Sequence, residues 1–593
     1  MRVLEPTMKD LKFTAAAVGL AVVISGCLSC SSAPPPPTGS KNVPAAAVGQ
    51  QPRAPHVPNS VTSGRAPMEG ACDLKQTLQL ALHLQLRNQA ELTQLLHDLY
   101  DPASPSFHKY LSVAAFTERF APTEKDYNSV VSWAKKNGLN VTATTPNRRL
   151  VAVEGPVKTV NRAFQVTVNN YRHPNDGRIF YSPNREPTPV GLSVQLLQIT
   201  GMNNYVLPHS MLKHSTVTNP NVAAVPNLNG SGPSGEYLPS DMRAAYYGNG
   251  PLTGAGQSIG IFSFDGYLAS DVTLYYSKTG MSSTVPIRNV LVDGFSGACT
   301  SVSGGTSSTC DDGEQVLDIV NAIGMAPGIK QILFYEGSSN TEILNQMATD
   351  NLAKVLSSSW GWNPADAASD DPIFQEFAAQ GQSYVSASGD DGAFNSSTYY
   401  FPSVDPYVIQ VGGTDLTTAG PGGAWAAETG WSHSGGGYIS GTPIPSWQQL
   451  AGVVNASNQA STTLRNTPDV AAEANLDNPT VVNGSFVTGY GGTSFAAPRW
   501  AGFLALVNQQ SAANGKGTVG FINPALYSLG VGTSYPSAFH DITSGNNPPS
   551  AGGSGFNAVP GYDLVTGWGS PAGVGLINQL AGSSAAQTSR STR

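Results

Sequence analysis

Short apolar runs recur between residues 258 and 413, and they are apolar nearly throughout rather than alternating with polar positions. The runs are SIGIFSF (258–264), QILFYEG (331–337), KVLSSSWG (354–361), SYVSASG (383–389) and YVIQVGG (407–413). Strands that are buried on both faces have this pattern, and helical stretches separate most of the runs. The pattern predicts an α/β domain at 236–582 with a doubly wound, mostly parallel sheet. Ligands of such sheets bind at the carboxyl ends of the strands, where polar turns containing glycine fall here.

The preceding block, 74–205, has a different pattern. Apolar residues recur at helical spacing in AELTQLLHDLY (90–100), and RLVAVEGPVKTVNRAFQVTVNNYRH (149–173) predicts strand, helix and strand. We therefore expect an α+β domain of ferredoxin-like type, with no catalytic cluster of its own. Residues 206–235 follow, largely without periodicity, and we interpret them as a linker that a protease could cut.

The N-terminus has the features of an export signal, which we place at 1–27. Lys9 and Lys12 precede the run FTAAAVGLAVVISGC, which is short for a membrane span and ends in small residues. Its last four residues are similar to a bacterial lipoprotein signal, in which Cys27 would carry the lipid anchor. A plain secretory signal is the alternative. We expect an exported protein, extracellular or anchored at the bacterial surface, with a Pro/Ala/Ser-rich tether at 28–73 and a tail at 583–593.

Charge is sparse and unevenly distributed. Charged residues make up 12% of the 593 residues, against about 25% in an average soluble domain. Residues 236–580 hold 8 Lys or Arg and 26 Asp or Glu, whereas the first 235 residues are basic. The absence of a basic stripe in 236–580 argues against nucleic-acid binding. We expect electrostatic attraction to help hold 74–205 against the acidic domain until acid weakens it, and packing alone is the alternative.

Two cysteines after the signal suit a disulfide. Cys299 and Cys310 flank a Gly/Ser-rich loop, and exported proteins commonly close such loops with a disulfide. Cys72 is left over, and we expect it to be a free thiol.

The stretch YGGTSFAAPRWAG (490–502) predicts a nucleophile, because Ser494 follows a Gly-Gly-Thr turn and precedes a helical stretch. Subtilisin-type serine proteases use a similar frame, together with a histidine that takes the proton of the serine. After residue 235 the chain has only His433 and His540. Neither lies in the His-Gly-Thr-His setting of the subtilisins, so another proton acceptor is needed.

Three acidic residues are candidates for this role. Glu314 and Asp318 in CDDGEQVLDIVNAIGMAPG are four residues apart, so they share one face of a helix whose other positions are largely apolar. A solvated acidic first turn that favours the helix dipole is the alternative for this pair. Asp390 follows a buried strand and a Ser-Gly turn, where a plain Asp-Gly turn is the alternative.

Together these residues resemble the sedolisins, the serine-carboxyl peptidase family, and in particular its kumamolisin-like pro-enzymes. The motifs of the family are a Glu-x-x-x-Asp helix, a Ser-Gly-Asp-x-Gly turn and Gly-Thr-Ser. DPASPSFHKYL (101–111) is similar to a pattern in the family's N-terminal activation domain. The resemblance implies a subtilisin-like catalytic domain at 236–582 and an activation pro-domain at 74–205. Ala269 stands where some members carry a further Glu.

The resemblance implies an acid-acting endopeptidase, made as a self-processing zymogen, that hydrolyses proteins or peptides through an acyl-enzyme on Ser494. Glu314 would accept the serine proton, Asp318 would orient Glu314, and a protonated Asp390 would stabilise the oxyanion. The pro-domain would be an intramolecular inhibitor, and we expect a monomer. A tripeptidyl-peptidase of the same family is the main alternative, and a non-catalytic surface lipoprotein with this fold is the other.

The resemblance also implies one structural Ca²⁺ near the C-terminus. Its ligands would be the carboxylates of Asp541 and Asp563 and the backbone carbonyls of Ile542, Val559 and Gly561, which form a hard-oxygen set. Outside this resemblance, lone aspartates in turns are ordinary turn residues. Many members have Gly where this chain has Val559.

Overall fold

The computed structural model describes residues 55–214, 229–299, 310–363, 367–395 and 399–582. The predicted export signal, Cys27, most of the predicted tether and the tail lie outside the described residues. Among the helices in the described ranges, none has the length and apolar character that a membrane crossing needs.

The N-terminal domain confirms the predicted ferredoxin-like α+β fold. Three helices, α2 to α4, connect β2 to β3, and α5 with β5 and β6 connects β4 to β7. The strands β2, β3, β4 and β7 form an antiparallel sheet in the order β3-β4-β2-β7. Helix α4 begins after Thr123, whose Oγ1 accepts the N–H of Asp126 at 3.1 Å. The elements of the domain are β2 (Thr77–Leu84), α2 (Gln89–Tyr100), α3 (Val113–Phe120), α4 (Glu124–Lys136), β3 (Asn140–Thr144), β4 (Leu150–Pro156), α5 (Val157–Phe164) and β7 (Leu196–Thr200).

Residues 55–73 differ from the predicted tether. They contain α1 (Asn59–Thr62) and β1 (Met68–Ala71), and β1 forms a second sheet with β5 (Val168–Arg172) and β6 (Ile179–Pro183). The pairing partner of β1 is about 100 residues away, so the local Pro/Ala/Ser-rich composition does not reveal the strand.

The catalytic domain confirms the predicted doubly wound sheet. Six strand pairs are parallel, in the order β11-β12-β10-β13-β15-β16-β18, and β17 adds one antiparallel strand to β16. The strands are β10 (Ser258–Ser263), β11 (Ile287–Leu291), β12 (Gln331–Glu336), β13 (Val355–Ser358), β15 (Ser383–Ala387), β16 (Ile409–Thr418), β17 (Trp425–Gly430) and β18 (Val470–Glu473).

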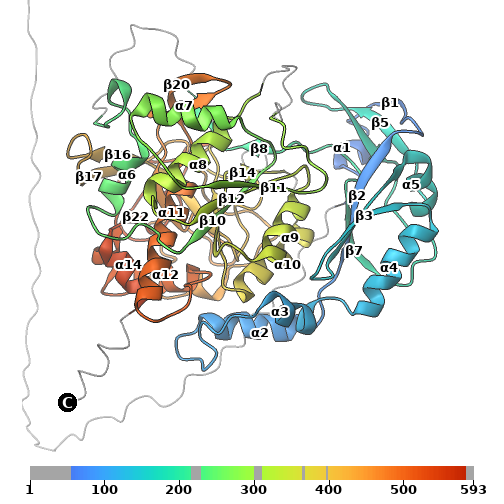
Figure 1. The fold of residues 1–593 in the computed structure, drawn as a ribbon, viewed down its shortest axis with the longest axis horizontal. Helices are drawn as coiled ribbons and strands as arrows, with labels where there is room; N and C mark the ends of the chain where they lie inside the picture. The colour runs from blue at the N-terminus through green and yellow to red at the C-terminus, as the bar shows by residue number, and fades with distance from the viewer. Residues whose placement is uncertain (1–54, 215–228, 300–309, 364–366, 396–398, 583–593) are drawn as a thin grey trace, which may run out of the picture. The chain divides into compact units, whose positions relative to one another are not determined.

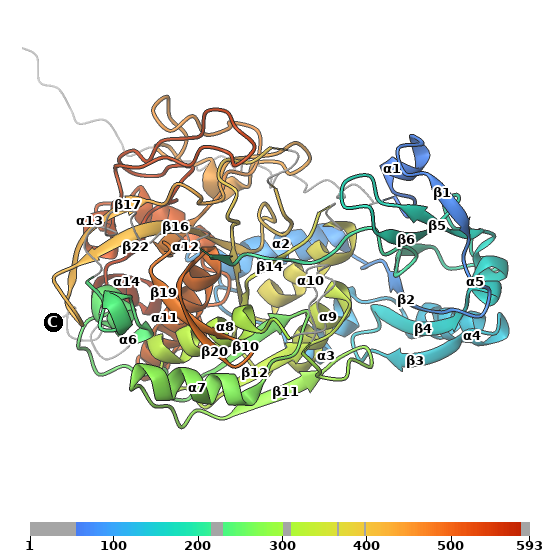
Figure 2. The ribbon, with the colours of Figure 1, turned by 90° about the horizontal axis from the view of Figure 1, so that it is seen from above.

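Helices cover both faces of this sheet. Figures 1 and 2 show α9 and α10 on the side opposite α11 and α14. Successive side chains of β10 follow this division, because Ile261 packs with the α8 and α11 core and Phe262 with the α9 and α10 core. The helices are α6 (Pro239–Tyr246), α7 (Ala269–Thr279), α8 (Gly313–Met325), α9 (Asn340–Asp350), α10 (Ala367–Ala379), α11 (Thr493–Ala513), α12 (Asn523–Gly530), α13 (Tyr535–Ala538) and α14 (Val574–Ala581).

Short strands connect the remaining segments, and two of them belong to the chain that leaves the N-terminal domain. The pairs are β8 (His209–Ser210) with β14 (Trp360–Gly361), β9 (Lys213–His214) with β20 (Ser485–Gly491), β20 with β19 (Asn478–Val482), and β21 (Phe539–His540) with β22 (Ser570–Pro571). Two 3-10 turns, η1 (Pro233–Gly235) and η2 (Ser446–Gln448), complete the described elements.

The structure joins Cys299 and Cys310 in a disulfide and leaves Cys72 free and buried.

A buried carboxylate ties β16, β18 and α12 together. Asp469, which is fully buried, accepts hydrogen bonds from Arg465 Nη2 at 2.7 Å, Gln410 N at 2.8 Å, Tyr527 Oη at 2.9 Å and Asn523 Nδ2 at 3.0 Å. Removing the carboxylate would leave the buried Arg465 without its charge partner.

We predict that Asp469→Ala lowers the free energy of unfolding by about 3–5 kcal/mol, measured by denaturant titration in a Ser494→Ala background. The control is Glu91→Ala, which breaks the exposed pair with Arg119 and should cost less than about 1 kcal/mol. Equal losses in the two variants would show that Asp469 does not have this structural role.

Candidate active site

Three of the predicted catalytic segments meet at the carboxyl edge of the sheet. Asp390 follows β15, Glu314 and Asp318 lie on the first turns of α8, and Ser494 is the second residue of α11. Helix α8 packs against α11, and all of its residues are buried. Gly492 precedes α11 with φ of +133°, a conformation that favours glycine.

Ser494 and Glu314 are in direct contact. Ser494 Oγ donates a hydrogen bond to Glu314 Oε2 at 2.9 Å, and both residues are buried. Among the described residues, no histidine hydrogen-bonds to Ser494. The carboxylate therefore occupies the position of a proton acceptor for the serine.

Asp318 lies one helical turn beyond Glu314. Ser359, which follows β13, donates its Oγ hydrogen to Asp318 Oδ1 at 2.6 Å. Burial raises the pKa of Glu314 well above its ordinary value, and the nearby Asp318 raises it further. Burial likewise raises the pKa of Asp318. Two buried carboxyl groups with raised pKa values retain protons that exposed carboxyl groups would release.

Asp390 faces the N-terminus of α11. Its Oδ1 accepts hydrogen bonds from Thr493 N and Thr493 Oγ1, both at 2.8 Å. Its Oδ2 is buried and has no hydrogen-bond partner among the described residues. Burial raises the pKa of Asp390 to about 7, although the bonds from Thr493 favour the ionised form. Below that pH the free oxygen can carry a proton and donate a hydrogen bond.

The four predicted catalytic residues thus lie in one buried cluster, but sequence reasoning missed three residues that contact it. Ser359 binds Asp318, Ser210 Oγ donates to Glu314 Oε2 at 2.5 Å, and Met211 contributes its carbonyl oxygen to Ser494. Ser359 lies in the apolar run 354–361, directly before Trp360. Its position at the end of a predicted strand could therefore have identified it as a residue near the site. Ser210 and Met211 carried no comparable signal, because their segment lacks periodicity.

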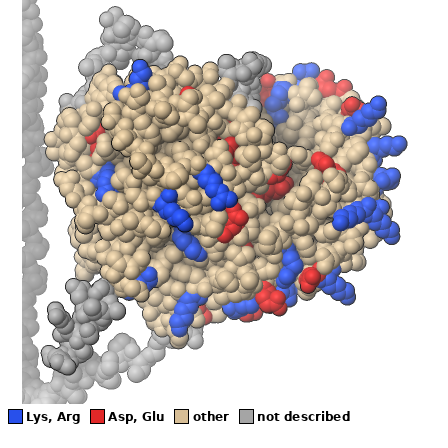
Figure 3. Space-filling view, viewed as in Figure 1, with Lys and Arg blue, Asp and Glu red and all other residues tan. Residues whose placement is uncertain are grey.

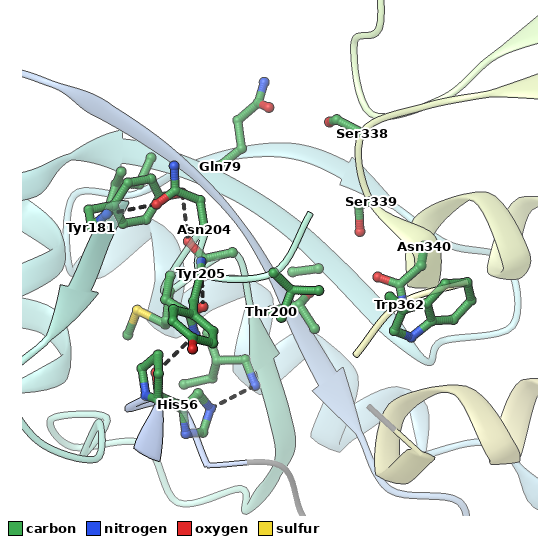
Figure 4. A pocket seen from close by; sticks show the side chains of 18 of the residues that line it. His56, Gln79, Tyr181, Thr200, Asn204, Tyr205, Ser338, Ser339, Asn340 and Trp362 are labelled. Carbon is green, nitrogen blue, oxygen red and sulfur yellow. Dashed lines mark hydrogen bonds between the residues drawn. The ribbon is translucent and has the colours of Figure 1, made fainter. Parts of the chain in front are cut away.

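A cavity of about 770 Å³ lies between the pro-domain and the catalytic domain. Figure 4 shows side chains from both domains around it, among them Gln79 and Tyr181 from the former and Asn340 and Trp362 from the latter. None of the four predicted catalytic residues lines it. The catalytic cluster is covered instead by the segment that contains Ser210 and Met211.

The predicted calcium ligands lie on two adjacent loops. Asp541 accepts hydrogen bonds from Gly561 N at 3.1 Å and Tyr535 Oη at 2.8 Å. Asp563 accepts hydrogen bonds from Val559 N at 3.0 Å and from Val565 N and Thr566 N, both at 2.8 Å. Within the described part of the chain, no Lys or Arg forms an ion pair with either aspartate, although Asp563 is fully buried. A carboxylate pair without a cationic partner supplies the oxygen ligands that a hard divalent cation prefers.

Two family models match the chain. The model described as pro-kumamolisin, activation domain, matches residues 65–205, and the model of the subtilase family matches residues 297–519. The first match covers the ferredoxin-like domain together with β1, and the second covers most of the parallel sheet and all four predicted catalytic residues.

Characterised relatives match nearly the whole chain. Sedolisin from Pseudomonas sp. (strain 101) is 31% identical, and the match covers 84% of this chain and 86% of sedolisin. Kumamolisin from Bacillus sp. (strain MN-32) is 30% identical, and the match covers 80% of this chain and 87% of kumamolisin. A solved structure of Pseudomonas sedolisin complexed with pseudo-iodotyrostatin is 32% identical, with a TM-score of 0.48, over 60% of this chain and 98% of its own. The sequence identity to sedolisin and kumamolisin shows that the chain belongs to the sedolisin family of serine-carboxyl peptidases, and it is a serine peptidase that carries a pro-domain.

Proposed function

We propose that the protein is an acid-acting endopeptidase, made as a self-processing zymogen, in which Ser494 is the nucleophile and Glu314 its base. The observation that carries this proposal is the buried hydrogen bond of 2.9 Å from Ser494 Oγ to Glu314 Oε2. Glu314 would accept the serine proton as Oγ attacks a peptide carbonyl, and would then pass it to the leaving amine. Water would hydrolyse the resulting ester.

Asp318 and Asp390 would have separate roles. Asp318, fixed by Ser359, would orient Glu314 and share a proton with it, so that the pair carries a single negative charge. Asp390 would donate a hydrogen bond from its protonated Oδ2 to the oxyanion, together with the backbone N–H of Ser494.

The raised pKa values of Asp390, Glu314 and Asp318 set an upper limit on the pH at which the site can act. The donor function of Asp390 requires the protonated form, which is present below a pH of about 7 and lost as the pH rises through that value. Ionisation of both Glu314 and Asp318 at high pH would add repulsion inside the buried site. Both effects disable the site toward neutral and alkaline pH.

The path of the chain through the site favours an endopeptidase over a tripeptidyl-peptidase. The backbone passes Ser494 without interruption, from the N-terminal domain through β8 and β9, so polypeptide occupies both sides of the nucleophile. A tripeptidyl-peptidase needs a closed end three residues before the cut bond, whereas here the chain continues to Pro208 and Val206, which line the cavity between the two domains.

The pro-domain makes buried contacts that suit an intramolecular inhibitor. Arg149 Nη1 lies 3.9 Å from Glu376 Oε2, and Asn147 Nδ2 donates to Asn345 Oδ1 at 2.8 Å. At the other end of the domain, Tyr100 Oη donates to the carbonyl of Ala378 at 2.6 Å. Because these contacts are largely buried, packing and local hydrogen bonds contribute to holding the domain, in addition to any long-range attraction.

We also propose one structural Ca²⁺, held by Asp541, Asp563 and the carbonyls of Ile542, Val559 and Gly561. The ion would supply the positive charge that the buried Asp563 lacks, and would join the loop after β21 to the 559–563 loop.

Export, with extracellular release or a lipid anchor at Cys27, is proposed from the sequence alone.

The first prediction from the proposed function tests the peptidase assignment. Ser494→Ala and Glu314→Gln should each lower hydrolysis of N-acetylated peptides between pH 3 and 7 by about 10⁴-fold or more, since each removes a reacting group. Internal cuts, identified by mass spectrometry, indicate an endopeptidase, and release of tripeptides from free N-termini alone would indicate the alternative. Asp311→Asn, an exposed change beside α8, is the control and should retain activity. Full activity in either catalytic variant would refute the assignment.

The second prediction concerns the oxyanion donor. Asp390→Ala should lower kcat about 10²–10³-fold with a smaller change in KM, because the hydrogen bond matters mainly in the transition state. Asp390→Asn keeps an N–H donor, so its kcat should fall less than that of Asp390→Ala. Because an amide does not ionise, the kcat of Asp390→Asn should also decline less as the pH rises through about 7. A change confined to KM in both variants would contradict the role.

The third prediction concerns calcium. A ligand bound by the folded state alone stabilises it by about 2.7 kcal/mol at 100 times Kd, so chelation should lower the melting temperature of Ser494→Ala protein. Asp541→Ala should melt at the same temperature with and without calcium, whereas Asp311→Ala should still respond. If the parent protein melts at one temperature in both conditions, the site does not bind calcium.

A further inference from the structure

A six-residue stretch of the chain, His209–His214, lies across the active site as an extended segment. Residues His209 and Ser210 pair antiparallel with β14, which follows strand β13 of the central sheet. Lys213 and His214 pair antiparallel with β20, which leads into Ser494. The segment is therefore held by backbone hydrogen bonds on both sides of the nucleophile, the way an extended peptide adds to a sheet edge.

The register of this segment places one carbonyl group at the nucleophile. The carbonyl oxygen of Met211 lies in close contact with Ser494 Oγ and accepts a hydrogen bond from the backbone N–H of Ser494 at 3.3 Å. The N–H of Met211 in turn donates to the carbonyl of Ser359 at 3.0 Å. The peptide plane after Met211 is thus fixed against the residue that attacks.

The same carbonyl oxygen faces the proposed oxyanion donor. A Cβ added to Gly492 would stand 2.3 Å from the Met211 oxygen and 2.7 Å from Asp390 Oδ2, so both oxygens border the small space above this glycine. Asp390 Oδ2 is the buried oxygen that has no hydrogen-bond partner in the described parts of the chain. It would acquire a partner when the Met211 oxygen becomes an oxyanion.

The side chains of the segment occupy separate sites. Met211 is 1% exposed, and its Cε lies only 2.6 Å from where a Cβ of Gly361 would stand, so Gly361 makes room for it. The ring of His209 stacks on Tyr400 with centroids 4.3 Å apart. On the other side of Ser494, Lys213 Nζ forms a salt bridge of 3.0 Å with Asp391. Anchors on both sides of Met211 prevent the register from slipping.

We infer that Met211–Leu212 is the peptide bond that the enzyme cuts in its own chain during maturation. This inference rests on the proposed peptidase function. Ser494 Oγ would bond to the Met211 carbonyl carbon while Glu314 takes the hydroxyl proton, and the C–N bond to Leu212 would break as that proton passes to the Leu212 nitrogen. Water would then hydrolyse the ester, which leaves a Met211 carboxylate and restores the Ser494 hydroxyl.

The test uses full-length precursor purified at neutral pH, transferred to acid and sampled over time by mass spectrometry. We expect the first new N-terminus to be Leu212 and the matching fragment to end at Met211. In H₂¹⁸O the Met211 carboxylate of early samples should carry one heavy oxygen. The rate constant of this first cut should not change on tenfold dilution, because the bond lies in the active site of its own chain. Ser494→Ala precursor should stay intact.

Two proline variants sharpen the result. Leu212→Pro replaces the N–H at the cut bond and should slow cutting there at least tenfold, whereas Val222→Pro, elsewhere in the predicted linker, should leave the first cut unchanged. A first cut at another bond, or an uncut precursor that still hydrolyses N-acetylated peptides in acid, would overturn this inference and leave the peptidase function standing. Absence of both self-cutting and peptide hydrolysis at every pH would refute the proposed function, and this inference with it.

Discussion

The hydrogen bond between Ser494 and a carboxylate that is kept out of water is the constraint on which this structure depends. Burying an ionised carboxyl group costs several kcal/mol unless it is paired, so Glu314 and Asp318 are arranged to hold protons rather than two full charges. The fold provides that environment, because α8 is buried along its whole length against α11 at the carboxyl edge of the sheet. A histidine would serve as base near neutral pH, whereas a carboxylate suits acid.

The sequence was sufficient for the features that depend on local pattern. Continuous apolar runs predicted the parallel sheet, and the four-residue spacing of Glu314 and Asp318 predicted a shared helix face, both of which the structure confirms. It was not sufficient for features that depend on pairing across long separations. Strand β1 pairs with a strand about 100 residues later, and Met211 reaches Ser494 across 283 residues, so neither has a local signature.

Burial also changes the meaning of the charge count. The catalytic domain is strongly acidic by composition, yet most of its Asp and Glu side chains are buried, and burial raises the pKa of many of them, including Glu376 to about 7. Figure 3 accordingly shows a largely uncharged surface over this domain, with Lys and Arg gathered on the pro-domain side. The long-range attraction between the two domains is therefore weaker than the sequence count indicates, and buried contacts such as the hydrogen bond from Asn147 to Asn345 add to it.

In this proposal the chain's own linker occupies the cleft, and the protonation state of the new amine decides whether the linker acts as an inhibitor or is cut for good. If the pairing of β9 with β20 and the contact of Lys213 with Asp391 persist after the proposed cut at Met211, the Leu212 amine would stay beside the acyl-enzyme at a high effective concentration. A neutral amine in that position would reform the peptide bond, and the segment would behave as an inhibitor. A new α-amine has a pKa of about 7.7–8.0 in solution, so acid protonates it and removes its nucleophilic lone pair. Acid would thereby leave water as the competent nucleophile, and the drop in pH that protonates Asp390 would also favour completion of the cut.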